Sequence, residues 1–457
     1  MTLSNEFLTA LESLCAVRQG DAVDALDPGF YPDNLGAGVM ALPATAQEVR
    51  AIVDLCRAHR VSIVPHGGRT GLAGAAATVP GQLIVDLKTM NRIVELDADA
   101  GTISVEAGAT LQAVQETCAA HGLTPGIDLA ARGSATIGGM IATNAGGMEA
   151  FRCGVMRHRV LGLEAVLADG SFLSDMTRVS KANEGLDIKH VLVGAEGRLG
   201  IVTGAVLKLE PLPGATSTAL VSFASAAAAV EAFHGLQALG ALLRAEIMWR
   251  AYAETVAQDQ GLADLVASFP GQVLVLFEHA GKTQSDAQAA QQDSLLPLME
   301  SGTAEHAVIA QNDRQVSDFW RIREESWAVE RRWPGGYWYD VSVPLNTLDQ
   351  YVCDLEEKLK AITADARFSC MGHLGDGNLH ITVSPPRGVR LDKACVDAAV
   401  FSGLKESGGS FSAEHGIGLE KMQALVAHGD PVKLAMARAI KQALDPDNLM
   451  NPGKVLS

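Results

Sequence analysis

The stretch from Cys370 to Val383 reads CMGHLGDGNLHITV and places His373 and His380 on either side of a glycine-rich turn. The Asp-Gly pair in this turn favours the positive dihedral angles of a tight hairpin, and the flanking residues are typical of paired strands. Such a hairpin brings the two imidazoles close enough to share one ion. A carboxylate is available in SAEHGIG, where Glu414 precedes His415.

Two imidazoles, one carboxylate and an open coordination position form the ligand set of a catalytic zinc site. Nitrogen and oxygen ligands also accept manganese, so the metal is not specified. A histidine at a strand end can equally be an ordinary capped residue without any metal. The residues alone leave both interpretations open.

Length, charge and cysteine content restrict the class of protein. With 457 residues, of which 48% are hydrophobic, the chain is long enough for two or three domains. A formal net charge of −17 argues against nucleic acid and anionic membranes as partners. Seven cysteines without a CxxC pair argue against a disulfide framework, a zinc ribbon or an iron–sulfur cluster. We therefore expect reduced thiols and a cytoplasmic protein.

The N-terminal residues 1–17 have apolar residues at helical spacing, which predicts a short surface helix. They contain acids but no early Lys or Arg, which argues against a signal or transit peptide. No apolar run reaches the ~18 residues that a transmembrane helix needs.

The elements that must position these side chains alternate short strands with helices. Residues 43–59 predict a helix with Thr45 as N-cap, and strands are predicted within 61–68, 82–87, 103–108, 161–170 and 200–211. Beyond a boundary near residue 214, we expect a strand entering a helix over 221–239, a strand over 272–280, a solvated helix over 286–300 and the hairpin strands 367–373 and 379–383. Residues 425–457 read as helix, turn, helix and a Pro-Gly tail. This pattern indicates an α+β fold.

Three glycine-rich loops, at residues 65–74, 133–147 and 194–204, lie in the first part of the chain. Consecutive glycines let backbone N–H groups converge on a pyrophosphate, and Ser134, Thr136 and Thr143 add hydroxyls. One such loop would be read as a tight turn, but three together favour a nucleotide-type cofactor.

Two common nucleotide-binding motifs are excluded by context. Residues 36–41 fit a degenerate Rossmann pattern, but no apolar strand precedes them. The Gly-Lys-Thr at 281–283 lacks the first glycine of a P-loop, because Leu276 stands there.

The motifs PHGGRTGLAG, PGIDLAARGSATIGGMIATNAGG, VLGLEAVLADG and GAEGRLGIVT resemble, in this order, the FAD-binding domain of the vanillyl-alcohol oxidase superfamily. The later GHLGDGNLHITV, SAEHGIGLEK and LDPDNLMNPGKV resemble its D-lactate / D-2-hydroxyglutarate dehydrogenase branch. The resemblance runs from about residue 37 to 456. It implies a PCMH-type FAD-binding domain, an FAD-linked oxidase C-terminal (cap) substrate domain and a C-terminal helical segment.

The expected domain limits are 1–36 for an N-terminal helical segment, 37–214 for the FAD-binding domain, 215–410 for the substrate domain, and 411–457 for a segment that returns to the FAD-binding domain. The resemblance implies that the first glycine loop holds the FAD pyrophosphate, that the other two line the rest of the cofactor, and that Asn451 lies near the flavin. Some relatives tether FAD through a histidine just after the paired glycines. Arg69 stands there, and His66 does not match that site, so we expect non-covalent FAD.

The residues expected to contact FAD are Pro65, Gly67, Gly68, Arg69, Thr70, Gly71, Leu72, Asp128, Gly133, Ser134, Thr136, Ile137, Gly138, Gly139, Ala142, Thr143, Asn144, Gly146, Glu196, Gly197, Gly200, Ile201, Val202 and Asn451.

The resemblance also assigns His373, His380 and Glu414 as metal ligands and His415 as the general base. Of the two metals that this ligand set allows, we expect zinc rather than manganese. Arg323 matches the arginine that clamps the substrate carboxylate. Asn378 and Thr382 are expected to contact the substrate. The chain departs from the 2-hydroxyglutarate enzymes at Trp327 and Trp338, where those enzymes are expected to bind the distal carboxylate through Thr and Lys.

Two indoles cannot neutralise a second carboxylate, so an apolar or aromatic substrate side chain is favoured, although both tryptophans could instead be core residues. We therefore expect an FAD- and metal-dependent D-2-hydroxyacid dehydrogenase for a D-lactate-like or larger monocarboxylate. D-2-hydroxyglutarate or D-malate oxidation, and a flavin-binding electron-transfer subunit of a glycolate oxidase-type complex, are the alternatives. The external electron acceptor would be an electron-transfer flavoprotein, a quinone or a cytochrome, and a homodimer stays open.

Overall fold

The computed structural model describes residues 3–386 and 388–456. They form two compact units. The first unit contains the chain up to Gly147, Cys153–Leu212 and the segment from Glu414 onward, and the second contains Met148–Arg152 and Pro213–Ala413. The domain limits expected from the sequence stay predictions.

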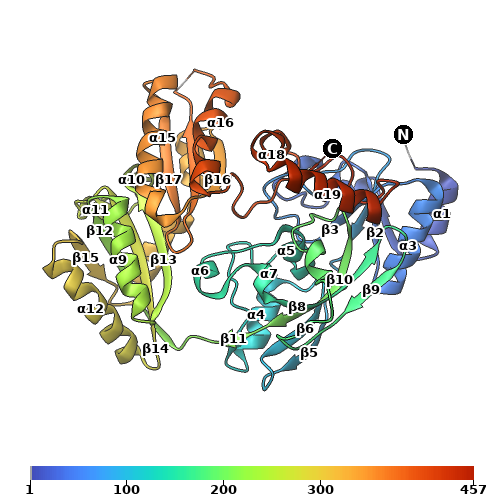
Figure 1. Ribbon diagram of the computed structural model, residues 1–457, viewed down its shortest axis with the longest axis horizontal. Helices are drawn as coiled ribbons and strands as arrows, with labels where there is room; N and C mark the ends of the chain where they lie inside the picture. Colours follow the sequence, from blue (N-terminus) through green and yellow to red (C-terminus); the bar gives the residue numbers. More distant parts are fainter. Residues whose placement is uncertain (1–2, 387, 457) are drawn as a thin grey trace. The chain divides into compact units, whose positions relative to one another are not determined.

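The first unit contains a four-stranded sheet in the order β1-β2-β4-β3 (Figure 1). Its strands are β1 (Ala16–Gln19), β2 (Val39–Leu42), β3 (Ile63–His66) and β4 (Leu83–Asp86), of which β2, β4 and β3 run parallel. The neighbouring helices α1 (Asn5–Glu12) and α3 (Ala46–His59) begin at N-caps, as the side chains of Ser4 and Thr45 accept from backbone N–H groups. Both were predicted from apolar periodicity.

The first unit also contains a second sheet, which has five antiparallel strands in the order β5-β6-β10-β8-β9. Its strands are β5 (Ile93–Asp97), β6 (Thr102–Glu106), β8 (Val160–Leu167), β9 (Phe172–Asp175) and β10 (Gly200–Lys208). The remaining elements are α2 (Asp21–Asp24), η1 (Pro32–Leu35), α4 (Leu111–Ala119), β7 (Leu123–Thr124), α5 (Ile137–Thr143), α6 (Ala150–Cys153, across the unit boundary), α7 (Met156–Arg159), α8 (Lys189–Leu192) and β11 (Glu210–Pro211).

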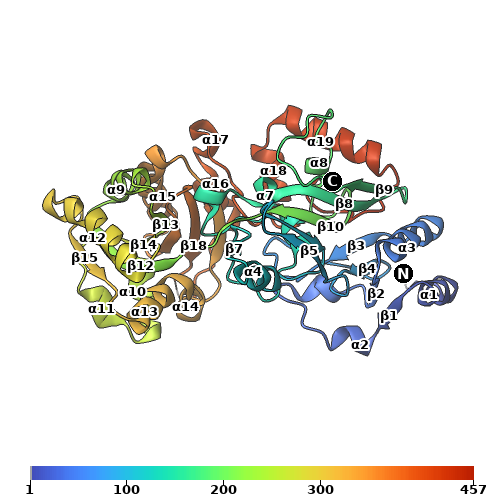
Figure 2. The same ribbon diagram turned by 90° about the horizontal axis from the view of Figure 1, so that it is seen from below.

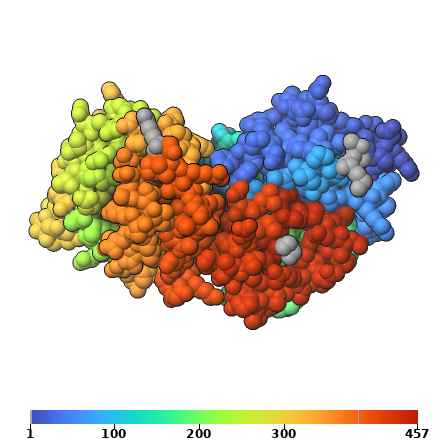
Figure 3. All heavy atoms as spheres, turned by 90° about the horizontal axis from the view of Figure 1, so that it is seen from above, coloured from blue at the N-terminus to red at the C-terminus, as the bar shows by residue number. Residues whose placement is uncertain are grey.

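The C-terminal segment supplies α18 (Met422–His428) and α19 (Pro431–Leu444) to the first unit. Met450 forms a parallel bridge with Ile63 of β3, and the Lys441 ammonium donates to the carbonyl of Arg198. Figure 3 shows this segment, in red, against the blue N-terminal part of the same unit. Residues at opposite ends of the sequence therefore build one core.

The second unit is one seven-stranded antiparallel sheet, ordered β15-β12-β14-β13-β17-β18-β16. Its strands are β12 (Ala215–Phe223), β13 (Leu242–Trp249), β14 (Val273–Gly281), β15 (His306–Ile309), β16 (Tyr337–Ser342), β17 (Arg367–His373) and β18 (Asn378–Ser384). Its helices are α9 (Ala226–Ala238), α10 (Arg250–Gln260), α11 (Ala263–Ala267), α12 (Gln284–Glu300), α13 (Asp313–Glu324), α14 (Trp327–Arg332), η2 (Leu345–Thr347), α15 (Leu348–Ile362), α16 (Lys393–Phe401) and α17 (Leu404–Ser407).

Helices cover both faces of this sheet, and Figure 2 shows α9 and α15 on one side and α10, α13 and α14 on the other. The second face carries a core that includes Met248, Leu274 and Met371 from the strands and Phe319 from α13. The helix predicted as solvated over 286–300 is α12, but it buries Gln291 and Leu295 because it packs on the sheet. Within the described residues, no helix combines the length and apolar character needed to cross a membrane.

Candidate active site

Strand register places the predicted chemistry on one face of the second unit's sheet. β17 and β18 form the expected antiparallel hairpin, with His373 opposite Asn378 and Met371 opposite His380. Side chains of directly paired residues project from the same face. His373 and His380 therefore share the face that carries Met371, which is covered by α10, α13 and α14.

Neighbouring strands add two carboxylates to this face. Glu246 of β13 pairs with His373, and Asp340 of β16 pairs with His380. Both carboxylates are buried, with 0% and 1% of the residue exposed. Neither was predicted as a site residue, because pairing of distant strands cannot be read from local sequence. The only local signal is a single acid within the apolar run LLRAEIMW.

Glu246 binds both Arg323 and His373. Arg323 donates to Oε2 from Nε at 2.7 Å, and its Nη2 lies 2.6 Å from the same oxygen. The Nδ1 atom of His373 lies 2.9 Å from Oε1. Burial by itself raises the pKa of Glu246, but the adjacent His373 and Arg323 outweigh it and lower that pKa. The carboxylate is therefore held ionised between two cationic or donor groups.

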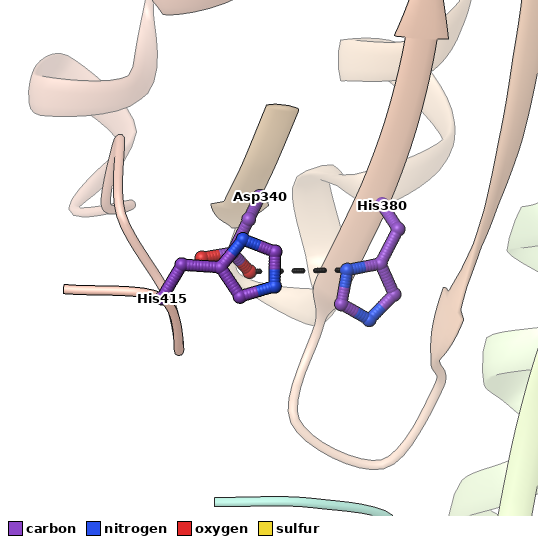
Figure 4. A group of neighbouring side chains, drawn as sticks. All are labelled: Asp340, His380 and His415. Atoms are coloured by element: carbon purple, nitrogen blue, oxygen red, sulfur yellow. Dashed lines mark ion pairs between the residues drawn. The ribbon is translucent and has the colours of Figure 1, made fainter. Parts of the chain in front are cut away.

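The two predicted metal-ligand histidines are brought together. Their Nε2 atoms lie 3.5 Å apart, and the rings meet nearly perpendicular, at 85°. His373 and His380 belong to one group of side chains close enough to hold an ion, and Asp340 and His380 to another. Figure 4 shows the ion pair between Asp340 and His380, with Nδ1 and Oδ1 separated by 3.9 Å.

Asp340 also holds the chain that leads to the other predicted site residues. Its Oδ2 accepts from the backbone N–H of Ala413 at 3.1 Å, and its Oδ1 accepts from the side chain of Asn378 at 2.9 Å. Glu414 and His415 follow Ala413 directly in the sequence. Because consecutive Cα atoms are about 3.8 Å apart, chain continuity limits how far Glu414 can lie from Ala413.

The predicted substrate residues Trp338 and Thr382 are a register pair one row further along the same face. Trp327, the first residue of α14, stacks obliquely on Trp338, with 5.8 Å between the ring centroids. Trp327 and Trp338 are 52% and 43% exposed, whereas Thr382 is buried. The indoles are therefore not core residues. They form an exposed apolar surface next to the strand pair that carries His380.

The first unit contains a cavity of about 350 Å³ lined by all three glycine loops. The predicted cofactor residues that line it are Pro65, Gly67, Gly68, Arg69, Thr70, Gly71, Leu72, Thr136, Gly138, Gly139, Ala142, Thr143, Gly146, Glu196, Gly197, Gly200 and Val202. Those outside the lining are Asp128, Gly133, Ser134, Ile137, Asn144, Ile201 and Asn451. Ile137 and Ile201 are fully buried in the core instead.

The lining also includes small and apolar residues that the motifs did not single out, among them Ala130, Ala131 and Leu192. Glu414 and His415 complete the lining. The general base expected from the sequence therefore lies at the wall of the cavity expected to hold the flavin.

The glycine loops fit a large planar cofactor because they pack where side chains could not. A Cβ on Gly67 would meet the hydroxyl of Thr136, and one on Gly68 would meet the carbonyl of Ser134. The first two loops can therefore approach each other this closely only as glycine backbone. Glycine backbone of this kind is what a pyrophosphate cradle is built from.

His66, which also lines the cavity, supports the same fit. Its Nε2 lies 2.8 Å from the carbonyl of Ala76, while its Nδ1 is buried without a hydrogen-bond partner among the described residues. Burial lowers the pKa of His66 to about 3, so the ring is neutral near pH 7. A neutral Nδ1 is an acceptor that a hydroxyl of a bound cofactor can satisfy.

Glu196 fixes the segment that carries His415. Its Oε1 and Oε2 accept from the backbone N–H groups of Ile417 and Gly418, at 2.7 and 2.8 Å. Burial raises the pKa of Glu196, although these hydrogen bonds oppose the rise. Asn451 donates to the carbonyls of Glu196 and Ala75, so it ties the third loop to the end of the first.

Arg69, at the position where some relatives carry a tethering histidine, is buried and paired with Asp86 at 2.8 Å. Its φ of 58° places it in the left-handed region. The guanidinium is thus committed to a structural ion pair.

Family comparisons agree with this geometry. Residues 37–175 match the family described as FAD binding domain, and residues 212–455 match FAD linked oxidases, C-terminal domain. The D-2-hydroxyglutarate dehydrogenase of Xanthomonas citri pv. viticola is 35% identical over 422 residues, covering 91% of this chain and 88% of that protein. The mitochondrial D-2-hydroxyglutarate dehydrogenase of Arabidopsis thaliana is 34% identical, covering 92% and 75% of the two chains.

Solved structures share the fold at lower identity. p-Cresol methylhydroxylase with bound substrate superposes with a TM-score of 0.75 at 17% identity, covering 99% of this chain and 96% of that one. Alkyldihydroxyacetonephosphate synthase gives a TM-score of 0.74 at 16% identity, covering 99% and 85%. The α+β, PCMH-type architecture expected from the sequence is confirmed. The chain therefore belongs to the FAD-linked oxidase family, within its branch of FAD-dependent 2-hydroxyacid dehydrogenases.

Proposed function

We propose that this protein oxidises a D-2-hydroxy acid to the 2-oxo acid, using non-covalent FAD and a divalent metal ion held by His373, His380 and Glu414. The observation that carries this proposal is the pair of Nε2 atoms facing each other at 3.5 Å. Where both nitrogens present lone pairs, a cation between them would be bound by both rings at this separation. Arg69 stands where a tether would be, which supports FAD held by the glycine loops alone.

The separation of the two nitrogens agrees with coordination of a tetrahedral ion. Two nitrogen ligands, each about 2.05 Å from one tetrahedral Zn²⁺, lie about 3.4 Å apart. The measured 3.5 Å matches this value. Glu414, one residue beyond Ala413, is the third ligand that the family resemblance assigns. This geometry favours zinc over manganese.

The roles of the side chains follow from their chemistry. When bound, the metal ion supplies the charge that lowers the pKa of a substrate hydroxyl, and the flavin supplies the hydride acceptor. His415 removes the hydroxyl proton as general base. Arg323 binds the substrate carboxylate next to C2. Its Nε and Nη2 atoms face Glu246, whereas no group among the described residues accepts a hydrogen bond from its Nη1, which is left for the substrate. Asn378 and Thr382 contact the substrate from β18.

The substrate side chain is expected to lie against Trp327 and Trp338. No lysine or threonine stands at these two positions to bind a distal carboxylate. Two arginines elsewhere on the fold are committed to other partners. Arg244 pairs with Glu278 and Glu149, and Arg250 donates to backbone carbonyls of Gly271 and Phe269. An apolar or aromatic substrate side chain therefore suits this surface better than a charged one.

D-2-hydroxyglutarate is the second candidate substrate, favoured by the names of the curated relatives described above. The identity of about one third leaves room for a change of side-chain specificity at the two tryptophans. Electrons would leave the flavin to an external acceptor such as an electron-transfer flavoprotein, a quinone or a cytochrome.

The two candidates are separated by comparing kcat/KM for D-lactate and larger apolar D-2-hydroxy acids with that for D-2-hydroxyglutarate and D-malate, using a dye as acceptor. Because both indoles are about half exposed, a distal carboxylate would keep part of its hydration. We therefore expect a preference for the apolar acids of about tenfold, not the several kcal/mol of full burial. Trp338→Lys should shift the preference toward the diacids. A wild-type preference for D-2-hydroxyglutarate would show the apolar assignment to be wrong.

A further inference from the structure

The carboxylate of Glu246 is a buried feature of the second unit's site that the catalytic roles above do not use. It comes from the middle of β13 and is 0% exposed. Placing an ionised carboxylate in an apolar core costs several kcal/mol unless it is paired and hydrogen-bonded. Its neighbours along the strand, Ala245 and Ile247, are apolar and buried. A buried charge here calls for a specific role.

We propose that Glu246 is a positioning residue that orients His373 as a metal ligand and, with its other contacts, fixes the substrate-binding guanidinium of Arg323. This inference rests on the proposed metal site and adds a residue that acts through the ligand rather than on the metal.

The orientation of His373 follows from its two nitrogens. An unprotonated Nδ1 would place its lone pair against a carboxylate oxygen 2.9 Å away, so Nδ1 carries the proton and donates it to Glu246. The neutral ring then has its lone pair on Nε2, the atom that faces Nε2 of His380. A carboxylate behind a ligating imidazole also raises the basicity of the ligand.

The same carboxylate sets Arg323. Two donors of the guanidinium, Nε and Nη2, lie 2.7 and 2.6 Å from one oxygen, which fixes the plane of the group. Arg323 is itself 6% exposed, so this pair is hardly screened by water. Glu246 therefore aligns the ligand and the clamp together, from one side of the site.

The sheet offers a matched control in Glu278 of β14. Glu278 is also buried, at 4% exposure, and pairs with an arginine of β13, Arg244, at 2.8 Å. Its hydrogen-bond and ion-pair partners within the described part of the chain include no histidine. Glu278→Gln thus removes a buried carboxylate–arginine pair from the same sheet without touching the histidines.

The test is calorimetric titration of Zn²⁺ into metal-depleted, flavin-loaded enzyme, comparing wild type, Glu246→Gln and Glu278→Gln. The amide of Glu246→Gln presents one oxygen where two are used and cannot neutralise Arg323. We expect the Kd for Zn²⁺ to rise roughly 10- to 100-fold in Glu246→Gln, as for other partners behind metal ligands, and to stay within about twofold in Glu278→Gln. Flavin content, which depends on the first unit, should be equal in all three.

Glu246→Asp serves if Glu246→Gln does not fold, since it keeps the charge and shortens the side chain. It should weaken Zn²⁺ binding measurably. A Kd for Glu246→Gln or Glu246→Asp equal to that of wild type would overturn the role of Glu246, as would equal weakening by Glu278→Gln. Wild-type enzyme that takes up no Zn²⁺ would instead overturn the metal site itself, and the role of Glu246 with it.

Discussion

His415 lines the flavin cavity. Shortly after it in the sequence, the backbone N–H groups of Ile417 and Gly418 donate hydrogen bonds to the carboxylate of Glu196. These hydrogen bonds restrain the backbone just after His415, and an imidazole is the side chain that most often acts as a general base. Asn keeps the polar character but accepts no proton at neutral pH. His415→Asn should therefore lower the rate of flavin reduction by roughly a hundredfold or more.

The matched control is His428→Asn, on α18 and outside the cavity lining. Both variants should retain FAD and metal, and only His415→Asn should lose rate. Anaerobic stopped-flow measurement of the flavin band checks this. Normal reduction by His415→Asn would remove this residue from the base role.

Among the elements, the first two glycine loops determine whether FAD binds. A Cβ on Gly68 would meet the backbone carbonyl of Ser134 and lie 3.1 Å from Cα of Ala135, so backbone would have to move. Gly68→Ala should therefore separate the loops and weaken FAD binding by about tenfold or more, the effect of roughly 1.4 kcal/mol. Gly235→Ala, in α9, meets nothing within 4 Å and should leave FAD binding unchanged.

The FAD content of each protein is measured as the flavin released on denaturation. Release from the wild type also tests whether FAD is attached non-covalently. Full FAD occupancy in Gly68→Ala at limiting FAD would contradict the cradle. If the yellow colour stays on the denatured wild-type chain, FAD is bound covalently, and only the prediction of non-covalent attachment is wrong.

At the end of β3, His66 makes stability depend on pH. Its pKa is about 3 in the folded chain and 6.5 in a free side chain, because burial disfavours the charged ring. The unfolded state therefore binds more protons between these values, and stability falls as pH drops through this window. His66→Gln removes this contribution, about 2 kcal/mol between pH 6.5 and 5.

Free energies of unfolding from denaturant titrations near pH 7 and pH 5 check this, with exposed His121→Gln as control. The loss on acidification should be smaller in His66→Gln than in wild type or the control. An equal loss in all three would show that His66 is not buried and neutral.

Local signals explain which elements and site residues could be predicted. The hairpin of β17 and β18 follows from its Asp-Gly turn, and α3 from Thr45 and its apolar period, because both depend on neighbours in sequence. Glu246 and Asp340 could not be found, since their places beside His373 and His380 come from pairing with β13 and β16, more than thirty residues away at the nearest. The family resemblance supplied Arg323, but not its carboxylate partner.

For the molecule as a whole, the residues of the proposed reaction are divided between its two units. The flavin cavity belongs to the first unit, the imidazole pair to the second, and the segment from Ala413 to His415 joins them covalently. No single motif carries the reaction.

The most direct measurement is anaerobic rapid mixing of the FAD-loaded wild-type enzyme with the two enantiomers of lactate and of a larger apolar 2-hydroxy acid. The D enantiomers should reduce the flavin, deuterium at C2 should slow this reduction, and prior removal of metal by a chelator should abolish it while FAD stays bound. L enantiomers should leave the flavin oxidised. Two results would contradict metal-assisted oxidation of a D-2-hydroxy acid. Either no D-2-hydroxy acid reduces the flavin, or a D-2-hydroxy acid reduces it at the full rate after the metal has been removed.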